Sequence, residues 1–248
     1  MATGPHSSTS ELLYKSAQRM GLQPAWLTPS GLFAIQLDGQ ERYVNAANSP
    51  LNPHVSVTLT KNKHTTRTIL ARHGLRNIPF TQPKTHEQAV LFLQEHGKII
   101  AKPVAGFGSR DIHIVTTEDQ LQSLDIAGYI LELYIPGIEM RYLVLNDTVI
   151  GVHESEYGTS VQPDRLLKRI SFASDEWDQG MVATSRQVAR ILGLNFAAVD
   201  FMVDESGNAY ILEVNSAPGF KWFHAPSSGP AIDVAGLFLE AMVKERTQ

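Results

Sequence analysis

The sequence predicts an α+β fold, in which strands paired into hairpins are interspersed with separate helices. Two observations lead to this prediction. Short apolar segments are joined by turn signals such as Asp38-Gly39 and Pro136-Gly137, which connect neighbouring antiparallel strands. Most helical segments are followed directly by glycine, a residue common just beyond a helix C-terminus. Helices and strands do not alternate regularly, as they would in a βαβ ladder.

The expected elements follow one another along the chain. Periodic apolar spacing and capping signals predict helices over 11–20, 65–73, 85–95, 176–192 and 231–244. Runs rich in β-branched residues, bounded by turns, predict strands over 32–37, 41–45, 54–59, 98–103, 112–115, 129–135, 139–145, 148–153, 197–203 and 210–215. The polar stretch 154–164 is expected to be irregular.

The composition excludes several classes of protein. The chain has 248 residues, 43% of them hydrophobic, and a net charge of −4, so we expect no nucleic-acid partner. Because there is no cysteine, disulfides, thiolate catalysis and Cys-based metal sites are excluded. The first ten residues are small and polar, which gives no signal peptide, and no run approaches the length of a membrane span. We therefore expect a cytoplasmic protein without a membrane partner.

The most informative segment is an apolar strand that carries Glu213 and Asn215. Alternate residues of a strand share a face, so both oxygen donors are expected to point the same way. A preceding apolar run contains Asp200, and a turn separates the two runs. If the hairpin pairs symmetrically about Ser206/Gly207, Asp200 lies opposite Glu213. These three donors suit Mg²⁺, which prefers oxygen ligands.

An ordinary hairpin with polar residues facing solvent is the alternative for this segment. It leaves unexplained why Asp200 and Glu213 each interrupt a strongly apolar run. Buried carboxylates are uncommon unless they are paired with a cation or bind a metal. We therefore favour the metal site.

A second group of residues has the chemistry of a phosphate site. Lys102 ends an apolar strand, where it needs a counter-charge. The glycine-containing loop that follows it consists of Gly106, Phe107, Gly108, Ser109 and Arg110. Glycines let backbone N–H groups approach phosphate oxygens closely, although such a loop alone is more often a simple hairpin turn. Lys63, at the expected start of a helix, is a weaker candidate because lysines there are commonly solvated.

The third group lies around Pro136-Gly137, where two strands meet. The backbone of 130–135 could contact an adenine edge, and Glu139 could accept hydrogen bonds from ribose hydroxyls. Arg141 lies two residues further on the same strand face as Glu139. A solvent-exposed Glu/Arg pair is the alternative for these two side chains.

Together these segments resemble the ATP-grasp superfamily of carboxylate–amine ligases over residues 55 to 220. Cyanophycin synthetase, bifunctional glutamate–cysteine ligase/glutathione synthetase and the ribosomal-protein glutamate ligases look similar. The resemblance implies an ATP-grasp fold, in which two α+β lobes clasp ATP. The chain would then comprise a short N-terminal α+β region over 1–60, a small lobe with the glycine-loop lid over 61–134 and a large lobe with the metal hairpin over 135–248.

The resemblance also implies roles for these residues. Lys63 and Lys102 would contact the phosphates, beneath a lid formed by Gly106, Phe107, Gly108 and Ser109. The adenine would be contacted by Glu132, Leu133, Tyr134 and Ile135, and the ribose by Glu139. Asp200, Glu213 and Asn215 would hold two Mg²⁺ ions, or Mn²⁺ in their place. The expected activity is ADP-forming ligation of an acid to an amine through an acyl phosphate, with an amino acid or short peptide as substrate.

Three further expectations concern catalysis and substrates. Arg141 would stabilise the transferring phosphoryl group or the tetrahedral oxyanion, and Lys102 would assist. Arg169, in the pair Lys168-Arg169, would meet the substrate carboxylate, although a basic pair is more often a solvated face. The segment 154–172 lacks the Arg-x-Asn pattern of the glutamate ligases, which puts the acceptor site in doubt. Residues 220–226 are unusually aromatic and either pack locally or wall the substrate pocket.

The region before Lys63 is shorter than the substrate domain of many ATP-grasp ligases. Another subunit, as in a homodimer, or a larger substrate would then complete the site. Two other functions keep the same nucleotide site. One is a kinase that phosphorylates a hydroxyl, and the other is an ATP-binding module without ligase chemistry.

Overall fold

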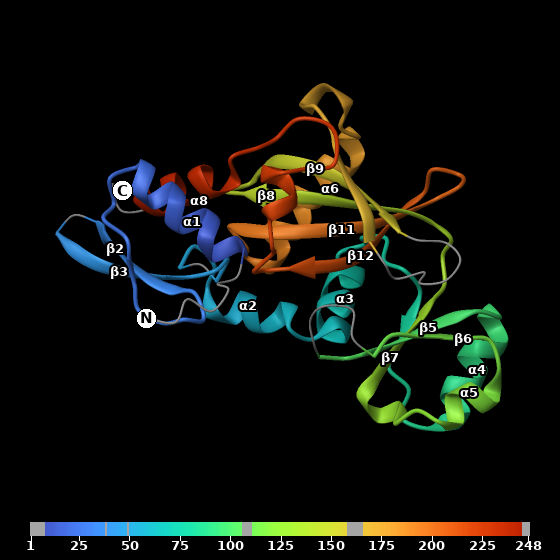
Figure 1. The fold of residues 1–248 in the computed structure, drawn as a ribbon. Coiled ribbons are helices and arrows are strands. Elements are labelled where there is room, and N and C mark those ends of the chain that lie inside the picture. Colours follow the sequence, from blue (N-terminus) through green and yellow to red (C-terminus); the bar gives the residue numbers. More distant parts are fainter. Residues whose placement is uncertain (1–7, 38, 49, 106–110, 158–165, 245–248) are drawn as a thin grey trace. The chain divides into compact units, whose positions relative to one another are not determined.

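The structure is a computed structural model, shown in Figure 1, which describes residues 8–37, 39–48, 50–105, 111–157 and 166–244. Within these ranges, no helix combines the length and the apolar character needed to cross a membrane.

The chain divides into two compact units, and it enters each of them more than once. The first unit comprises Met1–Val57, Glu139–Val199 and Asn215–Gln248, and the second comprises Thr58–Ile138 and Asp200–Val214. The predicted lobes over 1–60, 61–134 and 135–248 stay a prediction, since contacts alone do not define domains. Segment 61–134 lies wholly within the second unit.

Three sheets carry the strands of the described residues. The first contains β1 (Ala25–Trp26), β2 (Leu32–Leu37) and β3 (Gln40–Asn45) in that order. The second has the order β10-β9-β8-β11-β12, with β8 Gly137–Leu145, β9 Thr148–Tyr157, β10 Leu166–Ser171, β11 Phe196–Asp204 and β12 Ala209–Asn215. The third has the order β4-β7-β5-β6, with β4 Phe80–Thr81, β5 Ile99–Pro103, β6 His113–Val115 and β7 Tyr129–Leu133.

The helices of the described residues complete the fold. They are α1 Ser8–Arg19, α2 His54–Thr60, α3 Lys63–Arg72, α4 His86–His96, α5 Glu118–Gln122, α6 Gln179–Leu192, α7 Lys221–His224 and α8 Val234–Lys244, with two 3₁₀ turns, Ile126–Gly128 and Ser174–Glu176. In the second unit, α4 and α5 lie beside each other near the third sheet (Figure 1). Their apolar side chains pack there with those of β5 and β7 in one buried cluster.

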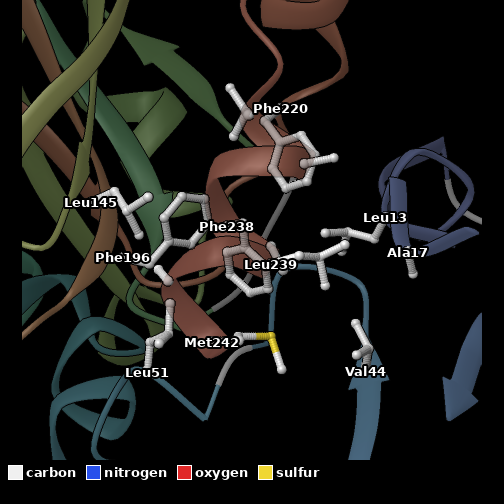
Figure 2. Packing of buried hydrophobic residues seen from close by; sticks show 14 of the residues in the cluster. Leu13, Ala17, Val44, Leu51, Leu145, Phe196, Phe220, Phe238, Leu239 and Met242 are labelled. Atoms are coloured by element: carbon white, nitrogen blue, oxygen red, sulfur yellow. The ribbon is translucent and has the colours of Figure 1, made fainter. Parts of the chain in front are cut away.

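The core of the first unit gathers around three aromatic side chains. Phe196, Phe220 and Phe238 are fully buried, and the rings of Phe196 and Phe238 meet edge to face with centroids 4.9 Å apart. Figure 2 shows these rings beside Leu13 of α1 and Leu239 of α8. Edge-to-face packing satisfies the ring quadrupoles as well as removing apolar area from water. The N-terminal and C-terminal helices therefore share one core.

Asn52 connects the backbone of distant segments inside this unit. Its side-chain NH₂ donates to the carbonyls of Phe196, at 2.7 Å, and Ser216, at 2.9 Å. Its side-chain oxygen accepts from the backbone amides of Asn195, at 2.8 Å, and Phe196, at 2.9 Å. All of its hydrogen-bonding capacity is used in a buried setting. Asn52 therefore fixes the start of β11 next to the end of β12.

Most predicted elements are confirmed, including the strands over 32–37 and 139–145, but the strand expected over 54–59 is wrong. That segment is helix α2. Pro53 accepts the first helical hydrogen bond, from the amide of Val57 at 3.1 Å, and its fixed φ suits a helix start. Ser56 is the one buried residue described in α2. Without a buried face, the β-branched residues there gain nothing from strand pairing, and local helix geometry prevails.

Several other boundaries differ from the prediction; for example, α8 begins at Val234 instead of residue 231. Residues expected to be irregular continue β9 to Tyr157, where they pair with β10, a strand that was not predicted. Helix α6 begins at Gln179 instead of residue 176, because the Asp178 carboxylate accepts from the amide of Met181 at 2.7 Å and caps the helix.

We predict that Asn52→Ala lowers the free energy of unfolding by about 2–4 kcal/mol, because it orphans two buried carbonyls and two buried amides. Urea denaturation followed by circular dichroism measures this change. Asn48→Ala, at an exposed asparagine nearby, is the matched control and should change stability by less than about 0.5 kcal/mol. Equal effects of the two substitutions would contradict this account.

Candidate active site

The centre of the second unit is a carboxylate shared by two cations. Glu132 on β7 is fully buried. Its Oε1 lies 2.8 Å from Nη2 of Arg67 on α3, and its Oε2 lies 2.8 Å from Nζ of Lys102 on β5. The Lys102 side chain is 12% exposed. The counter-charge that Lys102 was expected to need is therefore Glu132.

The local charges keep Glu132 ionised. Burial is the largest influence and raises the pKa of this carboxyl, but Arg67, Lys102 and Lys63 outweigh it and lower the pKa below its ordinary value. A buried carboxylate with one cation on each oxygen has its strongest acceptor positions filled. Lys63 is thus close enough to interact electrostatically with Glu132.

Lys63 is held at the N-terminus of α3, and the adjoining backbone is fixed on both sides. The Asn62 side chain caps this helix by accepting from the amide of Thr65 at 2.9 Å. The amide of Lys63 donates to the carbonyl of Val104, just beyond β5, at 3.1 Å. Both predicted phosphate lysines therefore lie on neighbouring elements. The predicted lid residues Gly106, Phe107, Gly108 and Ser109 lie outside the described residues.

The predicted adenine segment begins where β7 ends. The amide of Leu133 donates to the carbonyl of Pro79 at 2.9 Å, and that of Tyr134 donates to the carbonyl of Lys98 at 3.1 Å. The ammonium of Lys98 also lies 3.7 Å from the centre of the Tyr134 ring, a cation–π contact. These bonds fix the segment. The nucleotide contacts assigned to Leu133, Tyr134 and Ile135 stay predictions.

The predicted metal ligands are divided between the units. Asp200 on β11 is 2% exposed and lies in the second unit with Glu213, which is half-buried on β12, whereas Asn215 belongs to the first unit. Glu213 lines a pocket of the second unit together with Lys63 and Arg67. Across the described ranges, no three or more His, Cys, Asp or Glu side chains are grouped as metal ligands. The expected set of Asp200, Glu213 and Asn215 contains only two carboxylates and one amide, so it would not form such a group in any case. It stays a prediction.

The turn between β11 and β12 differs from the symmetric hairpin. The amide of Asp204 donates to the carbonyl of Asn208 at 3.0 Å, which closes a three-residue loop centred on Ser206. Gly207 takes the left-handed conformation that such a loop requires, with φ of 81°. Hydrogen bonds from Asn208 and the amide of Ser206 lower the pKa of the Asp204 carboxyl despite partial desolvation. If pairing centred on Ser206 continues without a bulge, Asp200 lies opposite Leu212, so this turn does not support the expected direct opposition of Asp200 and Glu213.

The first unit carries a polar face on strands β8, β9 and β10. Strand register places Glu139 beside Ser155, and Ser155 beside Arg169. The next row on the same face pairs Arg141 with His153, and His153 with Ser171. We call these six residues the polar face. Its sequence signal is alternation, visible in 139/141 and 169/171. His153 ended the predicted strand 148–153, whereas Ser155 lay in the stretch expected to be irregular.

The polar face contains internal contacts and an uncharged histidine. Nη1 of Arg169 lies 3.7 Å from Oε1 of Glu139, and the Ser155 hydroxyl donates to the same oxygen at 3.3 Å. Burial, and then the charges of Arg169 and Arg141, lower the pKa of His153 to about 2. The face therefore holds two arginines, one carboxylate and a neutral imidazole at neutral pH.

Two residues with evident importance were not found from the sequence. Arg67 follows Lys63 by four positions, so both lie on one face of α3, and this spacing was the available signal. His153 is 1% exposed, and its ring lies 4.6 Å from that of Phe223. That contact places part of the aromatic segment 220–226 in local packing against the polar face.

Residues 60–219, more than half of the chain, match the family described as the ATP-grasp domain. The chain belongs to the ATP-grasp family. The order of sites along the chain, from Lys63 through Lys102 to Glu213, lies within this match. The predicted family and α+β fold are therefore confirmed.

Curated relatives of this ATP-grasp chain include proteins that are named as ligases. A glutathione biosynthesis bifunctional protein of Listeria innocua is 31% identical over 58% of this chain, but the chain covers 20% of that protein. A probable alpha-L-glutamate ligase of Aeromonas salmonicida is 27% identical over 77% of this chain and 66% of its own length. A D-alanine–D-alanine ligase of Geobacter sulfurreducens is 26% identical over 65% of the chain and 56% of its own length.

Solved structures share the fold at lower identity. The macrocyclase MdnC of Microcystis aeruginosa, bound with its precursor peptide, has a TM-score of 0.71 at 14% identity and covers 98% of both chains. A bifunctional glutathione synthetase of Pasteurella multocida has a TM-score of 0.69 at 15% identity, over 96% of this chain and 44% of that one. These likenesses concern the fold alone.

His153 gives a pH-dependent stability with a definite sign. Its folded pKa of about 2 lies below its unfolded value, so between pH 6.5 and 2 the unfolded chain binds a proton that the folded chain does not. This group alone should reduce the free energy of unfolding by about 1.4 kcal/mol between pH 7.5 and pH 5.5.

Urea denaturation of wild type and His153→Gln at the two pH values isolates this contribution, because the variant lacks the titrating ring. His73→Gln, at an exposed histidine, should keep the full pH dependence of wild type. An unchanged pH dependence in His153→Gln would contradict the neutral, buried state.

Proposed function

We propose that this chain is an ATP-dependent carboxylate–amine ligase that forms an amide or peptide bond on an amino acid or short peptide. The observation that carries the proposal is the convergence of Lys63 and Glu213 on one pocket. The ion pair with buried Glu132 holds Lys102 in place in the same unit. Lys63 and Lys102, close to the carboxylate of Glu213, suit a phosphorylated ligand that binds together with a metal ion.

The donor chemistry of the metal hairpin fits Mg²⁺. Asp200, Glu213 and Asn215 offer two carboxylates and an amide oxygen, the hard ligands that this ion prefers. Mg²⁺ bound there, as two ions or with Mn²⁺ in its place, would neutralise charge on the β- and γ-phosphates. Lys63 and Lys102 would bind the phosphate oxygens. Leu133, Tyr134 and Ile135 would hold the adenine, and Glu139 the ribose. Glu132, whose two oxygens already pair with Arg67 and Lys102, would contribute to the nucleotide site by holding Lys102.

The reaction proceeds in two balanced steps. An oxygen of the substrate carboxylate attacks the γ-phosphorus of ATP, the bond to the β-phosphate oxygen breaks, and ADP leaves an acyl phosphate. The substrate amine then attacks the acyl carbon, loses a proton, and expels inorganic phosphate as the amide forms. The protein's part is positioning and charge stabilisation, because neither step requires a covalent protein nucleophile.

The polar face supports a carboxylate substrate. Arg141 and Arg169 lie in adjacent rows of one sheet face, where Glu139 is the single carboxylate. This excess of positive charge in a poorly solvated setting favours an anionic group. We assign Arg169 to the substrate carboxylate, and Arg141 to the transferring phosphoryl group or the oxyanion that follows. Names of relatives, which include glutamate and D-alanine ligases, agree with an amino-acid substrate.

The test is ADP release across pairs of amino acids and short peptides, with the products identified by mass. Ligation gives an amide together with free phosphate. A stable phosphorylated product would indicate a kinase instead. If MgATP binds and no pair releases ADP above background, the chain is a nucleotide-binding module and the ligase proposal fails.

We predict that Asp200→Asn and Glu213→Gln each reduce turnover at least about a hundredfold and weaken MgATP binding, because each removes a charged metal ligand. Steady-state ADP release and isothermal titration measure the two effects. Glu205→Gln, at an exposed carboxylate in the same hairpin, should behave as wild type. Normal turnover in either ligand variant would rule out the metal assignment.

Substitutions at Arg141 and Arg169 should change different kinetic constants. Arg141→Ala is expected to lower kcat roughly a hundredfold with little change in the KM for ATP, whereas Arg169→Ala mainly raises the KM for the carboxylate. Lys168→Ala is the control, because its exposed side chain pairs with Glu156. A raised KM for ATP in Arg141→Ala would make Arg141 a nucleotide-binding residue.

A further inference from the structure

Arg67 is a buried side chain that connects several segments of the second unit. It is 3% exposed. Its Nη2 donates to Oε1 of Glu132 at 2.8 Å and to the carbonyl of Leu212 at 2.5 Å, and its Nη1 donates to the carbonyl of Ile78 at 3.4 Å. One guanidinium therefore joins α3, β7, β12 and the segment before β4.

The division of Glu132 between two cations has an electrostatic consequence. Glu132 and Lys102 alone would form a neutral pair, and the lysine would attract a phosphate only weakly. Arg67 contributes a second positive charge to the same carboxylate. The three side chains together therefore carry a net charge of +1 while Lys102 stays fixed at Oε2.

Arg67 also lies next to the part of β12 that carries Glu213. Leu212, whose carbonyl accepts from Arg67, immediately precedes Glu213 in the chain. Arg67 and Glu213 also line the same pocket, together with Lys63. A substitution at Arg67 thus bears on the charge of Lys102 and on the backbone that carries Glu213.

We propose that Arg67 is a positioning residue that offsets the charge of Glu132, so that Lys102 is both anchored and left with positive charge for the nucleotide phosphates. The consequence for phosphate binding rests on the proposed function. An arginine with only a structural role would hold the same elements together. In that case, nucleotide affinity would not depend on the charge of Glu132. The two roles therefore differ in what a second substitution does.

The experiment compares MgADP affinity in four proteins at pH 7.5, by isothermal titration. The net charge of the trio is +1 in wild type, zero in Arg67→Met, and +1 again in the double variant Arg67→Met/Glu132→Gln. We expect about tenfold weaker binding in Arg67→Met, and recovery of most of that loss in the double variant. Arg67→Lys keeps the charge and should bind within about threefold of wild type.

The pH dependence supplies a readout with an unusual sign. Without Arg67, burial raises the pKa of Glu132, which then faces Lys102 of β5 and Lys63 of α3 as the remaining cations. Glu132 should therefore be protonated at a higher pH in Arg67→Met than in wild type, and its protonation returns the net charge to +1. The affinity of Arg67→Met relative to wild type should therefore improve as the pH falls. The ratio removes the titration of the nucleotide itself.

A second measurement needs no nucleotide. In protein labelled with ¹³C-lysine, the Cε signal of Lys102, assigned by its loss in Lys102→Arg, should report the protonation of the adjacent Glu132 at a higher pH in Arg67→Met than in wild type. Circular dichroism at each pH verifies that the variants remain folded. If Arg67→Met does not fold, Arg67→Lys/Glu132→Gln replaces it, and its net charge of +2 predicts tighter binding than wild type.

The outcomes separate the two proposals. Equal affinity in Arg67→Met and the double variant overturns the role of Arg67 and leaves the ligase proposal intact. Absence of MgADP binding by wild type overturns the proposed function, while the Lys102 signal still tests the effect of Arg67 on Glu132. A Lys102 signal with the same pH profile in wild type and Arg67→Met overturns the inference in either case.

Discussion

The arrangement of the second unit depends on one buried carboxylate, Glu132, and on the two cations that share it. A lone carboxylate at this depth would be strongly destabilising, and a single ion pair there would still leave unmet hydrogen-bonding capacity. With Arg67 on one oxygen and Lys102 on the other, burial becomes tolerable and three secondary-structure elements acquire fixed relative positions within the unit. The same arrangement holds Lys102 in one place, which is what a phosphate ligand requires of its partner.

The first unit also carries a cluster with an excess of positive charge. Its polar face has more positive than negative charge, and His153 contributes none because its surroundings hold it neutral. The ring of Phe223 packs on that imidazole, which is 1% exposed, so charges beside it are screened less than charges at the surface. Both units thus contain a cluster with more positive than negative charge, built on a buried carboxylate in the second unit and on a sheet face in the first.

Much of this could be predicted from the sequence, and the exceptions have physical causes. The family and fold follow from the ordered motifs around Lys102 and Glu213, since turn signals and apolar runs are local properties. Segment 54–59 was wrongly predicted because its β-branched residues favour strands, yet Ser56 is its one described buried residue. Arg67 could not be singled out, because a basic residue on an amphipathic helix is ordinarily solvated. Its partner lies 65 positions away, a distance at which sequence gives no signal. The three-residue turn at Ser206 was not predicted. One more residue in the loop between β11 and β12 shifts the strand register, and the residue composition of the loop does not reveal this shift.

The four hydrogen bonds of Asn52 have a bearing on what can be trimmed from this chain. The part that matches the ATP-grasp family begins at residue 60 and ends at residue 219. A fragment cut to those limits would keep Phe196 but lose the amide that fixes it, along with α1 and α8, whose side chains enclose it. The segment that defines the family by sequence is therefore not a self-sufficient folding unit. Domain swaps and minimal fragments in this chain need to carry both ends with them, because the flanks supply the interior of the part they surround.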